Sequence, residues 1–213
     1  MLVCDAAARY RGYRVPPARW QAWDYTSAGW YSVTICTRER APHFGRVVDG
    51  RMRLSPAGRI VWEEWRRTGD VRPGVVLDAF VVMPDHVHAV IGIADGRVAA
   101  NTDDERGTNV ETPRRGVSTG AVDVASIPFP PPILSGCPHA PRWVPGCLGA
   151  IVGRFKASCT RRIRATDMPD FAWQPRFHDA VIRNARHLAH VRRYVEANPE
   201  RWAARPTAAP PSP

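Results

Sequence analysis

The sequence has no long apolar run, no paired-cysteine motif and a shortage of acidic residues. No apolar stretch approaches the roughly 20 residues that a membrane-spanning helix needs, and the N-terminus lacks the basic start and apolar core of a secretory signal. The five cysteines are odd in number and none shows a C-x-x-C spacing. These features disfavour membrane, secreted and disulfide-stabilised proteins, and a reduced, cytoplasmic protein is the simplest interpretation.

The shortage of acidic residues leaves a strongly basic chain. The chain has 30 Lys and Arg residues but only 20 Asp and Glu residues, which gives a net charge of +10 and a pI near 10.2. Such an excess favours a polyanionic partner such as nucleic acid, because neutralising phosphates releases condensed counterions. The alternative is a generally Arg-rich proteome. A membrane surface is a weaker candidate, since no segment combines a basic face with a large, bulky apolar one.

The length of 213 residues suits a single domain with embellishments, or at most two small domains. We expect residues 1–28, rich in Arg, Pro and aromatics, to form an irregular arm. Residues 94–146 show neither a helical nor a strand period and predict a long, flexible insertion. The tail, 203–213, has the composition of a disordered segment.

Strand patterns and helix signals alternate along the rest of the chain. Asp49-Gly50 between short apolar runs predicts a hairpin, and Ser55 before Pro56, like Asn184, predicts a helix N-cap. The predicted fold is an α+β, ferredoxin-like sandwich, a central antiparallel sheet with helices packed on one face. Its elements are a strand over 30–37, a helix from Ser55-Pro56 to about residue 70, strands over 75–83 and 86–93, a helix over 148–167, an extended segment over 171–182, and a helix from Asn184 to about Ala197.

Apolar residues at helical spacing predict the buried faces of these helices. In the first helix the candidates are Ile60, Val61, Trp62 and Trp65. In the helix over 148–167 they are Leu148, Ile151, Val152, Phe155, Cys159 and Ile163. The cations elsewhere on that helix are candidate phosphate contacts, although a solvated surface is their more usual role. Together with two arginines near the following strand, the candidate DNA-binding residues are Arg154, Lys156, Arg161, Arg162, Arg164, Arg176 and Arg183.

His86 and His88, within VVMPDHVHAVIGI, are the first candidate site residues. Side chains at i and i+2 of a strand project from the same face, about 7 Å apart by strand rise, so both imidazoles could share one ion. The ordinary alternative is a pair of polar residues on a solvent-facing side. Because the surrounding strand is apolar, burying two imidazoles without partners would be costly, and a metal ion would satisfy both.

Tyr194 and Asn198 are the second candidate pair. Tyr194 lies at the edge of an apolar helical stripe among cations, which favour a phenolate, and Asn198 follows one turn later. A tyrosine nucleophile suits phosphoryl transfer because it forms a covalent phosphotyrosine. Two interpretations of each residue remain open. Tyr194 could be a core residue with its hydroxyl at the rim, and Asn198 could be either a helix C-cap before proline or an oxygen-donor metal ligand.

Three further residues, in the insertion and directly after it, could form a zinc site. Cys137, His139 and Cys147 are suitable ligand types, but their spacing fits no usual zinc pattern and a fourth ligand is missing.

Four stretches together resemble the REP-associated tyrosine transposases of the single-tyrosine HUH superfamily. They cover nearly all of the chain outside the insertion and the termini, and MPDHVH combined with RFHDAVIRN and a tyrosine ahead of Asn-Pro is specific. The stretches are DYTSAGWYSVTICTRER, LDAFVVMPDHVHAVI, LGAIVGRFKASCTRRI and WQPRFHDAVIRN with YVEANPERW.

The resemblance implies a ferredoxin-like fold, His86 and His88 as metal ligands, Asn198 as a third ligand and Tyr194 as nucleophile. The implied ion is Mg²⁺ or Mn²⁺, whereas ligand softness alone would suggest zinc. The implied activity is cleavage and joining of single-stranded DNA at palindromic hairpins through a 5′-phosphotyrosine, by a monomer or homodimer. A catalytically weak, domesticated hairpin-binding protein is the alternative.

Three other residues receive lesser expectations. His178 lies in a family motif and is expected to be structural or to contact DNA. Asp85 and Asp179 are expected to be turn residues.

Overall fold

A four-stranded antiparallel sheet organises the molecule. The structure, a computed structural model, describes residues 23, 25, 27–72, 74–94, 127–129 and 147–204. The elements that build it are β1 (Gly29–Cys36), α1 (Pro56–Asp70), β4 (Val75–Val82), β5 (His86–Ile93), α2 (Leu148–Arg164) and β6 (His178–Ile182). Apart from a separate hairpin inserted between β1 and α1, their order βαββαβ and the strand order β4-β5-β1-β6 are those of a ferredoxin-like fold, so the predicted fold class is confirmed.

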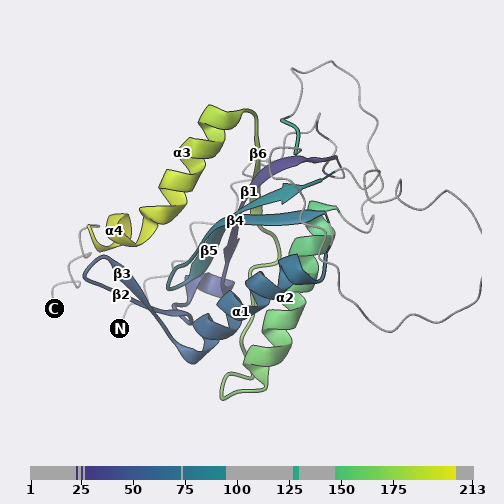
Figure 1. Ribbon diagram of the computed structural model, residues 1–213. Helices are drawn as coiled ribbons and strands as arrows, with labels where there is room; N and C mark the ends of the chain where they lie inside the picture. The colour runs from purple at the N-terminus through teal and green to yellow at the C-terminus, as the bar shows by residue number, and fades with distance from the viewer. Residues whose placement is uncertain are drawn as a thin grey trace, which may run out of the picture.

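The helices cover both faces of the sheet, not one as the sequence predicted (Figure 1). Because side chains alternate along a strand, Tyr31, Val33 and Ile35 face α1 and α2, whereas Trp30 faces the opposite side. That opposite face receives α3 (Ala185–Glu196), which contacts β4 and β5. The chain then continues into a short helix, α4 (Asn198–Ala203), which the sequence did not predict.

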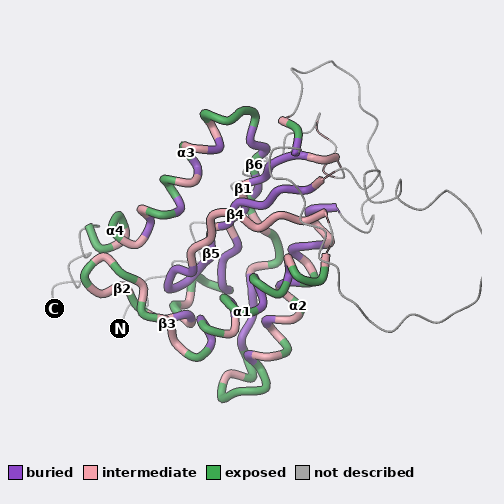
Figure 2. Tube along the Cα trace, viewed as in Figure 1, coloured by how far each residue is buried: buried purple, intermediate pink, exposed green. Residues whose placement is uncertain are grey.

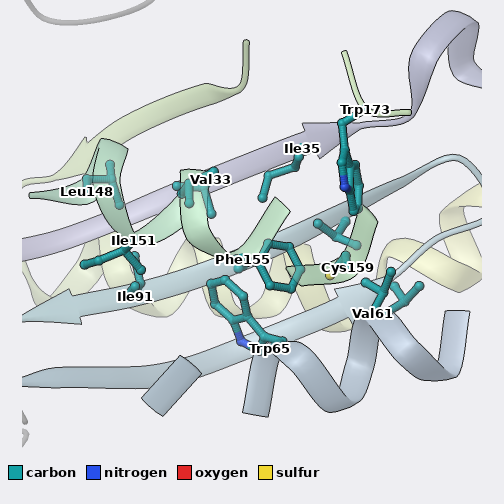
Figure 3. Packing of buried hydrophobic residues seen from close by; sticks show 14 of the residues in the cluster. Val33, Ile35, Val61, Trp65, Ile91, Leu148, Ile151, Phe155, Cys159 and Trp173 are labelled. Carbon is teal, nitrogen blue, oxygen red and sulfur yellow. The ribbon is translucent and has the colours of Figure 1, made fainter. Parts of the chain in front are cut away.

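The larger core lies between the sheet, α1 and α2 (Figure 3). Trp65 stacks on Phe80 at 4.9 Å between ring centroids and meets Phe155 edge-on at 5.2 Å. All six residues predicted for the buried face of α2 are buried. In α1, Val61 and Trp65 are buried as predicted, but Trp62 is 42% exposed, with Arg66 over its ring, and its predicted burial is wrong.

A smaller core attaches α3 to the other face of the sheet. Trp30, Val90 and Ile182 of the sheet are packed with residues of α3, whose buried and exposed positions alternate along its length (Figure 2). Ile127 is buried in the same cluster, so this part of the predicted flexible insertion is packed against the sheet. The α3 residues of the cluster are Leu188, Val191 and Val195.

Local sequence signals set the element boundaries. Asp49 and Gly50 adopt positive φ at the tip of the hairpin formed by β2 (Gly45–Val48) and β3 (Arg51–Leu54), as a two-residue turn requires. The Ser55 hydroxyl accepts from Gly58 N, and the Asn184 side chain accepts from His187 N, so both predicted N-caps are confirmed. No helix in the described parts of the chain is long and apolar enough to cross a membrane.

Gly58 provides a test of how tightly α1 packs. A Cβ at this position would lie 2.1 Å from the backbone oxygen of Phe44. Glycine-to-alanine changes in a helix ordinarily stabilise by up to about 1 kcal/mol, but we expect Gly58→Ala to lower the free energy of unfolding by about 2 kcal/mol, because the overlap forces the backbone apart. Denaturant titration measures this.

Gly149 in α2 supplies the matched control. The nearest atom to its added Cβ is Cys147 Sγ at 4.0 Å, so Gly149→Ala should leave stability unchanged or raise it slightly. Equal effects of the two substitutions would contradict the packing described for α1.

Candidate active site

Strand β5 carries both histidines, His86 at its start and His88 two positions later, on the face of the sheet that also carries α3. His86 is buried and His88 half-buried, and their Nε2 atoms lie 3.0 Å apart. The predicted convergence of the two imidazoles is therefore observed, and His86, at 4% exposure, is not a solvent-facing polar residue.

The outer ring nitrogen of each histidine has a partner. His86 Nδ1 lies 2.5 Å from Asp85 Oδ1, and His88 Nδ1 lies 2.7 Å from Thr34 Oγ1, on the residue directly opposite it in β1. Asp85 Oδ2 in turn accepts from Arg40 Nε at 2.9 Å. Such contacts fix ring orientation and leave both Nε2 atoms directed toward each other, an arrangement typical of metal-binding histidines.

Backbone contacts hold Asp85 in place. Asp85 lies in the β4–β5 turn, as predicted, and its backbone oxygen accepts from both the backbone N and the hydroxyl of Thr37. Arg40 reaches the carboxylate from a left-handed backbone conformation with φ of 58°, which is uncommon for a residue other than glycine. Arg40 also donates to Cys36 Sγ, and burial raises the pKa of that thiol despite the arginine.

The donor set fits a divalent metal ion. Two adjacent ligands of an octahedral ion with bonds of about 2.1 Å are separated by about 3.0 Å, which matches the 3.0 Å between the two Nε2 atoms. In the part of the chain that the structure describes, no group of three or more His, Cys, Asp and Glu residues could hold a metal. Among the described residues, a third protein ligand here would therefore have to be of another type, such as an amide.

Tyr194 is brought to the histidines of its own chain by α3. Its ring centroid lies 5.4 Å from that of His88, at an interplanar angle of 76°, and the residue is 38% exposed. Besides its apolar contacts, α3 is fixed to β4 by an ion pair of 2.6 Å between Arg192 and Asp78. Tyr194 therefore lies at the rim, partly open to solvent, beside the histidine pair.

Asn198 is buried beneath this rim, at 5% exposure. The C-cap of α3 is Ala197, and Asn198 begins α4, so the interpretation of Asn198 as a C-cap is wrong. Its side-chain amide makes no hydrogen bond within the described residues, and it is not one of the side-chain groups there that are shut off from solvent without a partner. Trp202, one turn further along α4, lies 5.8 Å from His86 between ring centroids. Asn198 thus lies one turn after Tyr194 and on the same short helix as a residue that contacts His86, and its amide has no hydrogen-bond partner among the described residues.

The α2 cations lie on the other side of the sheet from the histidines, and three of them make internal contacts. Arg162 pairs with Glu63 and Glu64 of α1, which raises the pKa of its guanidinium. Lys156 donates to the backbone oxygen of Gln174, and burial lowers its pKa. Arg164 donates to the oxygen of Phe171. These contacts give the three cations structural roles that the sequence prediction did not include.

The four other candidate DNA-binding residues are exposed: Arg154, Arg161, Arg176 and Arg183. Of these, Arg176 and Arg183 flank β6 in the sequence. The first residue of β6, His178, is exposed and lies opposite Thr34, which on its other side pairs with His88. Asp179 is buried within β6, so its prediction as a turn residue is wrong.

Only one of the three residues of the alternative zinc site, Cys147, belongs to the part of the chain that the structure describes. Cys147 is buried at the N-cap of α2, where its Sγ accepts from Ala150 N at 3.4 Å. Cys137 and His139 lie outside the described residues.

Asp85 provides a test of the contacts that orient the histidine rings through their Nδ1 atoms. We expect Asp85→Asn to weaken divalent-metal binding by about 10- to 100-fold, because the amide orients His86 less firmly and withdraws a negative charge. Titration calorimetry with Mn²⁺ measures the affinity, and the melting temperature reports whether the fold survives. Unchanged metal affinity in a folded variant would contradict this role.

Comparison with known proteins gives three findings. No protein-family model matches the chain. It is 25% identical over 184 residues to a protein of Haemophilus influenzae described as uncharacterized, covering 86% of this chain and 87% of that one. Among solved structures it is similar to a REP-associated tyrosine transposase bound to a REP hairpin, with a TM-score of 0.48, 16% identity and coverage of 82% of this chain and 68% of the other.

A second similar structure comes from Deinococcus radiodurans and is named as a candidate transposase. Its TM-score is 0.36, with 16% identity and coverage of 84% of this chain and 95% of the other. The function therefore has to be inferred from the residues of the site.

Proposed function

We propose that this protein is a metal-dependent single-stranded DNA endonuclease and strand transferase, a member of the REP-associated tyrosine transposases, which cleaves at palindromic hairpins through a 5′-phosphotyrosine. One observation carries the proposal. The histidine pair, with Nε2 atoms 3.0 Å apart, lies beside a half-exposed tyrosine whose ring is 5.4 Å from His88 in the same chain.

His86, His88 and the amide oxygen of Asn198 would hold the metal ion, which we propose to be Mg²⁺ or Mn²⁺. Support comes from the nitrogen spacing, the occupied outer nitrogens and the position of Asn198, a buried residue whose amide makes no hydrogen bond within the described chain. A bound divalent ion would polarise the scissile phosphate and offset the charge that develops on its oxygens.

Tyr194 performs the covalent step. Its Oη attacks phosphorus, the Tyr194 O–P bond forms and the P–O3′ bond breaks. The proton lost by the phenol is balanced by one taken up at the departing 3′ oxygen, so the products are a 5′-phosphotyrosine and a free 3′-OH. Because the bond energy is conserved, a 3′-OH can reverse the step and join strands.

The chain's own residues prepare this step. Thr34, Asp85 and Arg40 fix the orientation of the imidazoles, and the Arg192–Asp78 ion pair fixes the helix that carries the nucleophile. The exposed side chains of Arg176 and Arg183, in a chain of net charge +10, supply phosphate contacts. The choice of a hairpin substrate follows from the motif resemblance.

An end-labelling experiment tests the polarity of cleavage. Hairpin DNA from the host's extragenic palindromes, labelled at either its 5′ or its 3′ end, is incubated with protein and Mn²⁺ and separated on a denaturing gel. We expect the 3′ label to migrate with the protein and the 5′ label to be released on a shorter strand that a polymerase can extend.

Two other results would overturn the proposal. Label transfer from the 5′ end would indicate the opposite polarity. Tight, salt-sensitive binding without any covalent band, with either metal and across the hairpins tried, would favour the hairpin-binding protein instead.

A further inference from the structure

One face of α4 carries three residues that reach the site. Asn198, Arg201 and Trp202 are spaced i, i+3 and i+4 and therefore share that face. Asn198 is buried, Trp202 lies 5.8 Å from His86, and the guanidinium carbon of Arg201 lies 5.1 Å from the ring centroid of Tyr194. The short helix therefore contacts both the metal-binding and the nucleophilic parts of the site.

Arg201 differs from Arg192, the paired cation of α3, in its surroundings. Arg192 is neutralised by Asp78, whereas Arg201 is exposed and makes no ion pair with a carboxylate of the described chain. Its guanidinium instead lies over the face of the Tyr194 ring. An arginine that packs on the nucleophile while its charge is unmatched is available to an anion that approaches the tyrosine oxygen.

We infer that Arg201 is a catalytic residue that binds the non-bridging oxygens of the phosphate attacked by Tyr194; this inference rests on the proposed function. The planar guanidinium binds two phosphate oxygens at once. As the Tyr194 O–P bond forms and the P–O3′ bond breaks, negative charge grows on those oxygens, and a fixed cation stabilises that state more than the starting one. Arg201 takes up and releases no proton in this role.

The contact with the ring also positions the nucleophile. A cation over an aromatic face is attracted to its electron density, so Arg201 restrains a tyrosine that is otherwise partly open to solvent. A purely structural arginine would do only this. The two roles differ in one measurable respect, because only direct phosphate binding depends on the charge of the scissile phosphate.

The test compares Arg201→Ala and Arg201→Lys with a matched control, Arg193→Ala. Arg193 is an exposed cation in the last turn of α3, and among the described residues it makes neither an ion pair nor a contact with the Tyr194 ring. Each full-length variant is assayed for single-turnover cleavage at saturating hairpin with Mn²⁺, for hairpin Kd and for melting temperature. A second hairpin carries an uncharged methylphosphonate at the scissile position.

On the phosphodiester we expect Arg201→Ala to slow cleavage by about 100- to 1,000-fold. Arg201→Lys should lose roughly tenfold, since it keeps the charge but not the two-pronged contact. Arg193→Ala should stay within about threefold of the wild type. On the methylphosphonate the loss in Arg201→Ala should shrink to less than about tenfold, because the charge that the arginine stabilises is gone.

The inference is overturned if Arg201→Ala cleaves the phosphodiester at nearly the wild-type rate, if it loses no more than Arg193→Ala, or if its loss is equal on both hairpins. The last result would leave Arg201 as a structural contact of the ring. Absence of covalent product from the wild-type protein is a separate outcome, which overturns the proposed function and the inference with it.

Discussion

Tyr194→Phe should abolish the covalent protein–DNA product, with a loss in cleavage rate of about 10⁴-fold or more. The substitution removes only the hydroxyl, so the nucleophile is lost while the ring keeps its place beside His88. Because the residue is 38% exposed, its hydroxyl contributes little to the fold, and hairpin affinity should stay within about threefold of the wild type. A denaturing gel measures the first effect and fluorescence anisotropy the second.

Arg186→Ala is the control for this experiment, since it removes an exposed side chain at the far end of the same helix. It should leave both quantities nearly unchanged. A Tyr194→Phe protein that still becomes attached to DNA would show that another residue is the nucleophile.

His88→Ala should remove most of the divalent-metal affinity, by about 100-fold or more, and cleavage with it, since one of two imidazole ligands is lost. His88 is half-buried, so this variant should keep its fold better than His86→Ala, which would leave a cavity at a buried position. Calorimetric titration with Mn²⁺ measures the affinity.

His178→Ala is the matched control for metal binding. His178 lies in the same cross-strand row as His88, with Thr34 between them, but on the exposed edge strand. Its replacement should leave the Mn²⁺ affinity unchanged. If His88→Ala bound Mn²⁺ as tightly as the wild type does, the histidine pair would not be the metal site.

The parts of the site that the sequence predicts are those set by local geometry. Strand alternation placed His86 and His88 on one face, and helical spacing identified the six buried residues of α2. The capping roles of Ser55 and Asn184 are likewise determined within a few residues, by side-chain contacts to the next backbone amides. Patterns of this kind need no knowledge of the tertiary structure.

The contacts between distant segments were not predictable in this way. Nothing near Asp85 in the sequence indicates that Arg40 holds its carboxylate, because the contact depends on an unusual backbone conformation in the turn after β1. Similarly, amphipathic spacing predicts that α3 has a buried face but not which side of the sheet receives it. A central sheet has apolar residues on both of its faces, so no single residue indicates which face α3 will cover.

Charge patterns gave the least reliable prediction. Cations on α2 suggested a phosphate-binding surface, yet Arg162 satisfies two carboxylates of α1, one of them buried, and Lys156 binds backbone oxygens. A cation on an amphipathic helix can equally serve its neighbours in the fold, and the sequence does not reveal which carboxylates will lie opposite. Arg201, by contrast, is not singled out by any sequence pattern, although its guanidinium packs on the ring of Tyr194.

The most direct measurement is to identify the atom that becomes attached to DNA. Wild-type protein is incubated with a palindromic hairpin and Mn²⁺ or Mg²⁺, the covalent product is isolated under denaturing conditions, and mass spectrometry of its peptides locates the modified residue. We predict a product that requires the metal and carries the nucleotide on Tyr194. A covalent nucleotide on any other residue, or none with either metal, would contradict the account.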